Sequence, residues 1–340
     1  MKITIETVAQ AAGVSVSTVS RVLNSPELVT EKTRNKVLKV LQDMDFQPNQ
    51  NGRVIGTQRS KTIGIVVPGI EKQFFTELQR GIHKAAFSND VNILLYDAGD
   101  GNFEESMKGV SFLKSRQCDA ILYCSLPVHQ EDVEVLERLD IPVAFALTGS
   151  SAHIPAFKVD DVAAAYDATA HLATRGHQHI AMISGGLTNE VAGQTRYDGY
   201  RLAIKEYNLP FSDEYVAYGD FRFDGGYEAM GRILENRIEI PITAVFAASD
   251  EMALGAMRRI HEAGLRVPDD ISVMGFDNLS ISTMVTPQLT TVAQPFSDIG
   301  ESSIAFLARQ IKDGRSHTDK GIYYFSHRIV SRESVKIHGR

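Results

Sequence analysis

Apolar residues near the start of the chain recur with the spacing of one helix face. They stand at positions i, i+3, i+4 and i+7, namely Ile5, Val8, Ala9 and Ala12. Gly13 follows, and glycine readily adopts the left-handed backbone conformation that ends a helix. The pattern therefore predicts a short amphipathic helix that stops at Gly13, where the chain turns.

A second short helix is predicted after the turn. Ser15 is a favourable N-cap, and an apolar face follows at Val19, Val22 and Leu23. The opposite face carries hydroxyl, guanidinium and amide groups, on Ser17, Ser20, Arg21 and Asn24. Two helices around a tight turn, with such groups on the second, are typical of a helix-turn-helix that enters the major groove of DNA. The alternative is an ordinary alanine-rich helical hairpin.

A third helix with a basic surface completes this N-terminal part. Thr30 is predicted to cap it, and its apolar stripe consists of Val37, Val40, Leu41 and Met44. Its cations are Lys32, Arg34, Lys36 and Lys39. Gln47-Pro48 is expected to end the helix, because the residue before proline is pushed out of the helical region. The polar composition of residues 49–61 predicts a linker.

From Thr62 onward, buried strands alternate with helices. The predicted strands are 62–67, 91–96, 120–124, 143–147, 179–184, 214–218, 244–248 and 271–276. The predicted helices are 74–87, 103–116, 132–139, 162–174, 194–207, 225–236, 251–263 and 296–311. Such alternation predicts parallel sheets covered on both faces, arranged as two α/β units in tandem. Small ligands bind where strand ends and helix starts converge, so we expect a cleft between the units.

Charge is distributed unevenly along the chain. Residues 1–61 hold nine Lys and Arg against five Asp and Glu, a net charge of +4, whereas the remainder has a net charge of −11. The basic part coincides with the helix-turn-helix and suits a phosphate backbone, while the acidic part is repelled by DNA. With 340 residues, we expect two or three domains.

Candidate catalytic and metal-binding motifs are weak. We find no nucleotide-binding glycine loop, nucleophile elbow or zinc signature, so we expect no enzyme activity, cofactor or metal. His177 and His179 have no neighbouring ligand residues, and we interpret Asp160-Asp161 and Asp269-Asp270 as caps and turns. Without a signal sequence or a long apolar run, we expect a cytoplasmic protein with reduced Cys118 and Cys124 rather than a secreted sugar-transport protein.

The ordered motifs resemble the lactose/galactose repressor (LacI/GalR) family of bacterial transcription regulators, most closely its catabolite control members. The matching segments are Val8-Ala9, Ala12-Gly13-Val14-Ser15, Thr18 to Asn24, Pro48-Asn49 with Arg53, Arg175-Gly176-His177, Ser249 to Gly255, Val267 to Asp270, Gly275 to Asn278 and Thr286 to Val292. The resemblance implies a helix-turn-helix domain (1–48), a hinge helix or linker (49–61) and a core like that of periplasmic sugar-binding proteins. The core subdomains are then 62–159 with 294–325, and 160–293 with 326–335.

The resemblance also implies a homodimer on double-stranded DNA carrying a pseudo-palindromic operator. Bases would be read by Val16, Ser17 and Arg21, while Thr4, Ser15, Thr18 and Asn24 would contact phosphates. The hinge contributes Asn49, Arg53 and Ile55, of which Ile55 would wedge into the minor groove. Gly52 and Gly56 stand where alanines are expected, and each disfavours hinge-helix formation by roughly 0.8–1.0 kcal/mol.

In that family a small carbohydrate in the cleft controls DNA affinity. The residues that match effector-binding positions are Phe75, Leu147, Arg196, Phe221, Ser249 and Asp277. The guanidinium of Arg196 suits adjacent hydroxyls or an anion, so a sugar and a sugar phosphate both stay open. A structural alternative is that Arg196 and Asp277 pair only with each other and hold the two units together.

A protein corepressor is the alternative effector. Catabolite control proteins dock a serine-phosphorylated phosphocarrier protein partly through an Arg in the helix that begins at Phe296 here. This chain has Ala305 at that place, although Asp298 and Arg328 remain. The sequence therefore favours a repressor of carbohydrate-utilisation genes with a small effector over one with a phosphocarrier partner.

Overall fold

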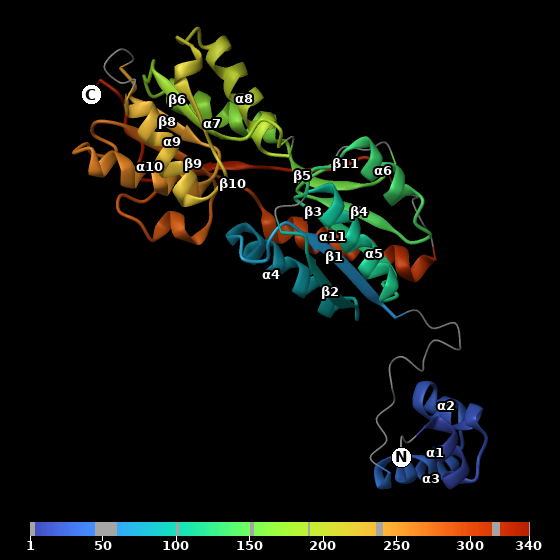
Figure 1. Ribbon diagram of the computed structural model, residues 1–340. Coiled ribbons are helices and arrows are strands. Elements are labelled where there is room, and N and C mark those ends of the chain that lie inside the picture. Colours follow the sequence, from blue (N-terminus) through green and yellow to red (C-terminus); the bar gives the residue numbers. More distant parts are fainter. Residues whose placement is uncertain are drawn as a thin grey trace. The chain divides into compact units, whose positions relative to one another are not determined.

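The computed structural model describes residues 4–44, 60–99, 102–149, 153–189, 191–235, 241–314 and 320–339. The chain divides into two compact units, Met1–Arg59 and Ser60–Arg340. Figure 1 labels their helices and most of their strands. Among the described residues, none of the helices is both long and apolar enough to cross a lipid bilayer.

The first unit contains three helices, α1 (Ile5–Ala12), α2 (Val16–Asn24) and α3 (Glu31–Asp43), with a 3-10 turn η1 (Pro26–Leu28). Thr4 and Thr7 form a reciprocal capping box at the start of α1. Gly13 ends α1 with φ +59°, as the sequence predicts. Apolar side chains from all three helices make its core, namely Val8, Ala9, Ala12, Val19, Val22, Val37 and Leu41.

Thr30 is the N-cap residue of α3, as the sequence predicts, but its side chain does not cap the helix. Helix α3 begins directly after Thr30, but the Thr30 hydroxyl donates to the Thr33 hydroxyl at 3.0 Å and caps no backbone N–H group. Helix α3 ends at Asp43 with Met44 as its C-cap. The predicted breaker Gln47-Pro48 and the hinge positions lie outside the described residues.

The second unit is built on two six-stranded sheets, each of which defines a lobe. The sheet of the first lobe has the order β11-β5-β4-β3-β1-β2 and is parallel throughout. Its strands are β1 (Thr62–Val67), β2 (Asn92–Asp97), β3 (Ala120–Cys124), β4 (Val143–Ala146), β5 (Ala156–Val159) and β11 (Ile322–Phe325). Its helices are α4 (Gln73–Ser88), α5 (Phe103–Ser115), α6 (Gln130–Glu137) and α11 (Phe296–Asp313).

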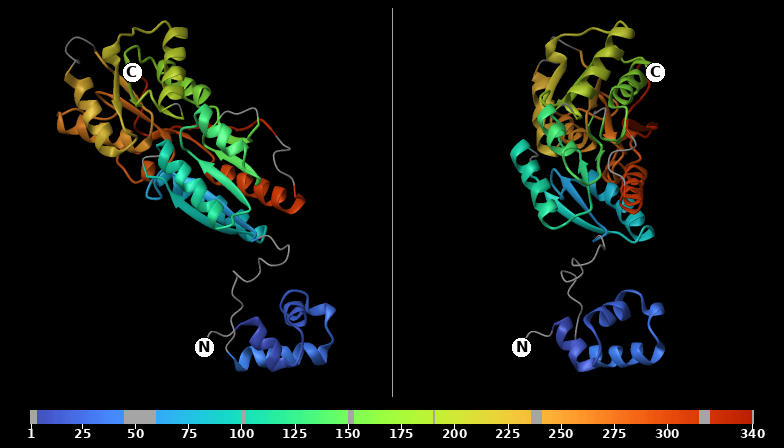
Figure 2. Two further views of the ribbon diagram at one scale, coloured as in Figure 1. Left: turned by 45° about the vertical axis from the view of Figure 1, so that its right-hand side comes forward. Right: turned by 90° about the vertical axis from the view of Figure 1, so that its right-hand side faces the viewer.

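Alternate residues of these strands face opposite helical layers. Ile63 and Ile65 of β1 pack into the core that α4 and α11 cover, whereas Val66 packs with residues of α5 and α6 on the other face. Helices α4 and α11 lie side by side although they are far apart in the sequence (Figures 1 and 2). Both sheet faces are therefore buried, which explains why the strands read as continuous apolar runs.

The second lobe has the strand order β12-β10-β9-β8-β6-β7, with the edge strand β12 antiparallel to β10. Its strands are β6 (Ile180–Gly185), β7 (Val216–Gly219), β8 (Ala244–Ala247), β9 (Ser272–Asp277), β10 (Thr290–Ala293) and β12 (Arg328–Val330). Its helices are α7 (Asp161–Ala173), α8 (Gly193–Glu206), α9 (Phe223–Glu235) and α10 (Asp250–Glu262), with 3-10 turns η3 (Asp213–Tyr215) and η5 (Ser280–Thr283).

The chain passes between the lobes three times. The passages join β5 to α7, β10 to α11 and β11 to β12. The predicted fold class is confirmed, as are the predicted helices and strands of this unit to within two residues at each end. Four short strands, β5, β10, β11 and β12, were not predicted from the sequence.

Candidate functional site

The exposed face of α2 presents a cluster of small polar groups. The Ser15 hydroxyl accepts a hydrogen bond from the Thr18 backbone N–H at 3.2 Å and lies 2.8 Å from the hydroxyls of Ser17 and Thr18. Val16 is 41% exposed, and Ser17 and Arg21 are also exposed. A guanidinium, hydroxyls and an exposed apolar group are the chemistry that reads base edges.

Other predicted DNA-binding residues are placed as follows. Thr4 is exposed at the start of α1, Thr18 is half-buried in the first turn of α2, and Asn24 is the last residue of α2. Asn49, Arg53 and Ile55 lie outside the described residues. The structure thus brings Ser15, Val16, Ser17, Thr18 and Arg21 together on one helix.

A cleft with a cavity volume of about 300 Å³ lies between the two lobes. The first lobe and the passages supply Glu71, Lys72, Phe74, Ser125, Leu147, Lys158, Gln294 and Phe296. The second lobe supplies Asp161, Asn189, Val191, Ala192, Arg196, Asp220, Phe221, Arg222, Phe223, Asp224, Ser249, Glu251, Asp277 and Leu279. Five of the six predicted effector residues therefore share one cavity.

Phe75, the sixth predicted effector residue, is not in the cleft. Its side chain is 2% exposed and packs in the core of the first lobe with Leu78 and Ile82. The preceding residue, Phe74, lines the cleft instead. On a helix, the side chains of adjacent residues point about 100° apart. Phe74 therefore faces the cleft while Phe75 faces the core of the first lobe.

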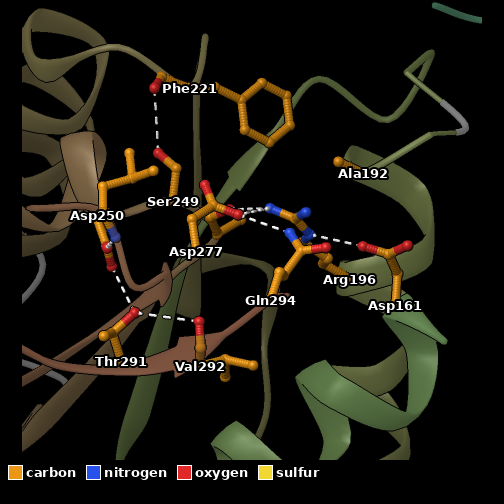
Figure 3. A network of polar contacts seen from close by, with 12 residues as sticks. Asp161, Ala192, Arg196, Phe221, Ser249, Asp250, Asp277, Thr291, Val292 and Gln294 are labelled. Atoms are coloured by element: carbon orange, nitrogen blue, oxygen red, sulfur yellow. Dashed lines mark hydrogen bonds and ion pairs between the residues drawn. The ribbon is translucent and has the colours of Figure 1, made fainter. Parts of the chain in front are cut away.

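Arg196 is the centre of a polar network in the cleft (Figure 3). Its Nε donates to Asp161 Oδ1 at 3.1 Å, and its Nη1 donates to the carbonyl of Ala248 at 2.6 Å. Asp277 Oδ1 lies 3.7 Å from Nη1, and the guanidinium carbon lies 3.8 Å from the centre of the Phe276 ring. The side chain is only 8% exposed, so this network fixes the direction of the guanidinium.

The alternative in which Arg196 and Asp277 hold the two lobes together is wrong. Arg196 belongs to α8 and Asp277 ends β9, and both elements are in the second lobe. The shorter ion pair of Arg196 is with Asp161 at the start of α7, also in the second lobe. The network therefore organises one wall of the cleft.

Burial perturbs the carboxylates beside this network. The pKa of Asp277 is raised to about 6, mainly because the group is removed from water, while Arg196 and a hydrogen bond from Gln294 Nε2 at 2.7 Å oppose the shift. The pKa of Asp250 is also raised, by burial and then by the charge of Asp277. Its oxygens accept from Thr291 Oγ1 at 2.5 Å and from the Leu279 N–H at 2.7 Å.

Four cleft residues other than glycine adopt positive φ angles. They stand at the ends of strands or in the loops that follow, namely Ser125 (+51°), Leu147 (+58°), Phe221 (+67°) and Asp277 (+115°). Such conformations cost of order 1–3 kcal/mol each and cluster where ligands are held. Their concentration here supports a binding role for the cleft.

Phe221 and Ser249 have defined structural supports. The Phe221 ring packs against Gly185, where an added Cβ would lie 2.1 Å from Phe221 Cζ. The Ser249 hydroxyl donates to the Phe221 carbonyl at 3.1 Å and accepts from the Met252 N–H at 3.1 Å, which caps α10. The Ser249 hydroxyl therefore holds the Phe221 backbone and the start of α10 in place, whereas the Phe221 ring lines the cavity.

The structural interpretation of the acidic pairs holds for three of the four residues. Asp160 caps α7 through the Ala163 N–H, and Asp269 and Asp270 pair with Arg266. Asp161 is different, because it is buried against Arg196. Asp161 was not predicted from the sequence as a cleft residue, and neither were Lys158, Asn189 and Gln294, which also line the cleft. Their positions near strand ends were the available signal.

The histidines and cysteines have ordinary surroundings. His177 contacts Thr243 Oγ1 and the Lys336 carbonyl, while His179 contacts the Tyr215 hydroxyl. Cys118 and Cys124 are buried free thiols, and burial raises the pKa of Cys118 to about 11. Within the described part of the chain, no group of three or more His, Cys, Asp or Glu is suited to a metal ion.

A helix-turn-helix unit combined with a two-lobed α/β unit and a polar cleft defines a class of DNA-binding transcription regulator. Residues 4–49 match the model of bacterial regulatory proteins of the lacI family, and residues 169–335 match that of a periplasmic binding protein-like domain. The chain belongs to the lacI family of bacterial regulatory proteins, and it is a DNA-binding transcriptional regulator.

Full-length relatives support this assignment. Catabolite control protein A of Priestia megaterium is 37% identical over 337 residues, which cover 99% of this chain and 100% of the relative. The lac repressor dimer bound to operator and the anti-inducer ONPF superimposes with a TM-score of 0.86 at 27% identity, covering 99% of this chain and 100% of that one. A complex of the transcriptional regulator CelR with cellobiose gives a TM-score of 0.73 at 28% identity, covering 98% and 100%.

Proposed function

We propose that this regulator represses carbohydrate-utilisation genes and that a small carbohydrate in the cleft controls its affinity for DNA. The observation that carries the proposal is the cavity wall in which the buried Arg196–Asp161–Asp277 network lies beside the Phe221 ring. Charged groups that bind hydroxyls next to an aromatic face are the usual elements of a sugar site. The cellobiose complex of a relative supports the same choice of ligand.

The DNA-binding role is assigned to residues 1–48, joined by 49–61 to the core. Val16, Ser17 and Arg21 read bases, and Thr4, Ser15, Thr18 and Asn24 contact phosphates. Asn49, Arg53 and Ile55 are proposed hinge contacts, with Ile55 in the minor groove. The exposed side chains of α2 support the base-reading assignment.

A homodimer is proposed because a pseudo-palindromic operator requires two heads. The operator-bound lac repressor dimer supports this arrangement. Sedimentation of the purified protein at micromolar concentration tests it, and we expect a dimer; a monomer or a tetramer would contradict the proposal.

Calorimetry and mobility shifts test the effector. Wild type and Arg196→Ala are titrated with a panel of sugars and sugar phosphates, and bound operator DNA is then challenged with each ligand. We expect at least one ligand to bind wild type, to lose affinity in the variant and to change operator affinity. A wild type that responds to no carbohydrate would sink the proposal.

The second candidate is a phosphocarrier protein as corepressor, favoured by the full-length similarity to catabolite control protein A. It needs a cation for the phosphoserine on α11, where this chain has the half-buried Ala305. The same calorimetry with a serine-phosphorylated phosphocarrier protein tests it. Tight binding of that protein together with no sugar response would favour this candidate.

A further inference from the structure

We propose that the carbohydrate effector carries no negatively charged group, so the cleft takes a sugar rather than a sugar phosphate. This inference rests on the proposed function and specifies its ligand class. It follows from the ion pairs that the cleft cations form and from the acidic residues at helix N-termini around the cleft.

The cations that line the cleft have carboxylate or other partners. Arg196 pairs with Asp161 at 3.1 Å and with Asp277 at 3.7 Å, and Lys158 Nζ lies 3.8 Å from the second oxygen of Asp161. Arg222 Nη2 lies 3.2 Å from Glu71 Oε1. Lys72 is engaged as well. A phosphate would have to compete with these carboxylates for every positive charge that it met.

Carboxylates outnumber cations around the cavity. The lining holds Glu71, Asp161, Asp220, Asp224, Glu251 and Asp277 against Lys72, Lys158, Arg196 and Arg222. Burial raises the pKa of Glu251, because a charged group is poorly solvated at this position, while the charge of Arg222 opposes the shift. A phosphate ester adds a charge of roughly −1.5 to −2 at neutral pH and would be repelled here.

Several helix N-termini at the cleft, which are the usual phosphate sites in α/β folds, carry acidic residues of the chain. The acidic residues in the first turns are Asp161 in α7, Asp224 in α9, Asp250 with Glu251 in α10, and Asp298 in α11. Helices α4 and α8 also begin at the cleft, and their first turns contain no acidic residue. Free N–H groups are further reduced by the side-chain caps Asp160 on α7 and Ser249 on α10. The positive ends of the α7, α9, α10 and α11 dipoles are therefore complemented by the chain itself.

An uncharged polyol fits the same groups. Carboxylate oxygens accept hydrogen bonds from hydroxyls, and an arginine donates to hydroxyl oxygens without losing its ion pairs. The rings of Phe74, Phe221, Phe223 and Phe296 supply the apolar surface for a sugar face. The lining therefore offers a sugar hydrogen-bond acceptors, hydrogen-bond donors and apolar surface.

Calorimetry with matched pairs tests the inference: glucose, ribose and cellobiose, each against its own terminal phosphate ester. We expect the tightest ligand to be an uncharged sugar whose ester binds at least about tenfold more weakly. Tighter binding of an ester would overturn this inference and leave the proposed function standing. Absence of binding by any of the six compounds would overturn both.

Charge variants sharpen the test. Asp224→Asn removes one negative charge from the cleft lining, so we expect the affinity of the ester relative to its sugar to rise several-fold. Glu228→Gln is the matched control, because Glu228 is exposed on the same helix but does not line the cleft. An equal effect of both variants, or no effect of Asp224→Asn, would contradict the electrostatic argument.

Discussion

Asp277 combines an unfavourable backbone angle with a carboxylate that is shielded from water. Its φ of +115° lies in a region that residues with a Cβ seldom occupy, and its side chain is 12% exposed. The position is held by β9 on one side and by hydrogen bonding from Gln294 on the other. Strain and burial at one residue indicate that the position serves binding rather than stability.

The protonation of Asp277 has a predicted effect on stability. The pKa is about 6 in the folded protein against an ordinary value of 3.8, so the folded state binds the proton more tightly. The unfolding free energy therefore falls as pH rises through this window, by about 1.4 kcal/mol for each unit of pKa difference.

Asp277→Asn is expected to flatten this pH dependence. Urea unfolding of wild type and variant at several pH values between about 4 and 7 measures it. The charge of Asp277 also raises the pKa of Asp250, so the variant removes that repulsion as well. Parallel stability curves for the two proteins would show that Asp277 does not titrate in this range.

Arg21 is predicted to read a base. Replacing it with Ala should cost about 1–3 kcal/mol of operator binding and relax specificity at one position. Lys39→Ala is the control, because Lys39 is an exposed cation on α3. Mobility shifts with operator and random DNA compare them. Equal weakening of both DNAs by Arg21→Ala would reduce Arg21 to a phosphate contact.

At the scale of elements, the turn between α1 and α2 depends on Gly13. Its φ is +59°, and an added Cβ would meet only Lys36 Nζ, at 3.5 Å. The cost of a side chain is therefore in the backbone and not in packing.

We expect Gly13→Ala to destabilise the first unit by about 1–2 kcal/mol, and Gly13→Asn by less, because Asn tolerates the left-handed region better. Hydrogen exchange of the α1 and α2 amides measures the loss directly. If the α1 and α2 amides of Gly13→Ala exchanged as slowly as those of wild type, the turn would not depend on a glycine at this position.

The predictability of the elements follows their length and burial. Strand β1 was predicted to the residue because its six positions are almost wholly buried. Strand β12 has three residues, none of them buried, which are too few to establish a pattern. Each residue of β11 lies 166 positions after its partner in β5, for example Ile322 after Ala156, so the local sequence holds no sign of the pairing.

The position of the cleft between the two lobes could be predicted from the sequence, but the polar contacts inside it could not. Arg196 was identified by resemblance, yet its main partner Asp161 lies 35 residues earlier, at a helix start where an acid is usually a cap. Only the tertiary fold separates Asp160, which caps, from Asp161, which binds Arg196. The sequence predicted Phe75 in the cleft, whereas the structure places Phe74 there. This error has the same cause, because tertiary packing sets the rotation of α4 about its axis.

At the scale of the whole second unit, two lobes joined by three short passages suit a hinge motion. Across the cleft, Arg222 Nη2 of the second lobe lies 3.2 Å from Glu71 Oε1 of the first lobe. Both side chains are more than half exposed, at 54% and 60%. Exposed pairs contribute about 0.2–1 kcal/mol, so this contact favours the closed arrangement only slightly.

Glu71→Gln is therefore expected to weaken effector binding by less than about fivefold, with a smaller effect at high salt. Arg222→Gln should do the same, and the double variant should be no weaker than either single variant, since the two changes remove one interaction. Glu77→Gln is the control, because it breaks a pair with Arg80 inside α4. Calorimetric titration of wild type, the two single variants and the double variant with the effector completes this double-mutant cycle. Fully additive losses would mean that the two side chains contact the ligand independently and do not act as a closing pair.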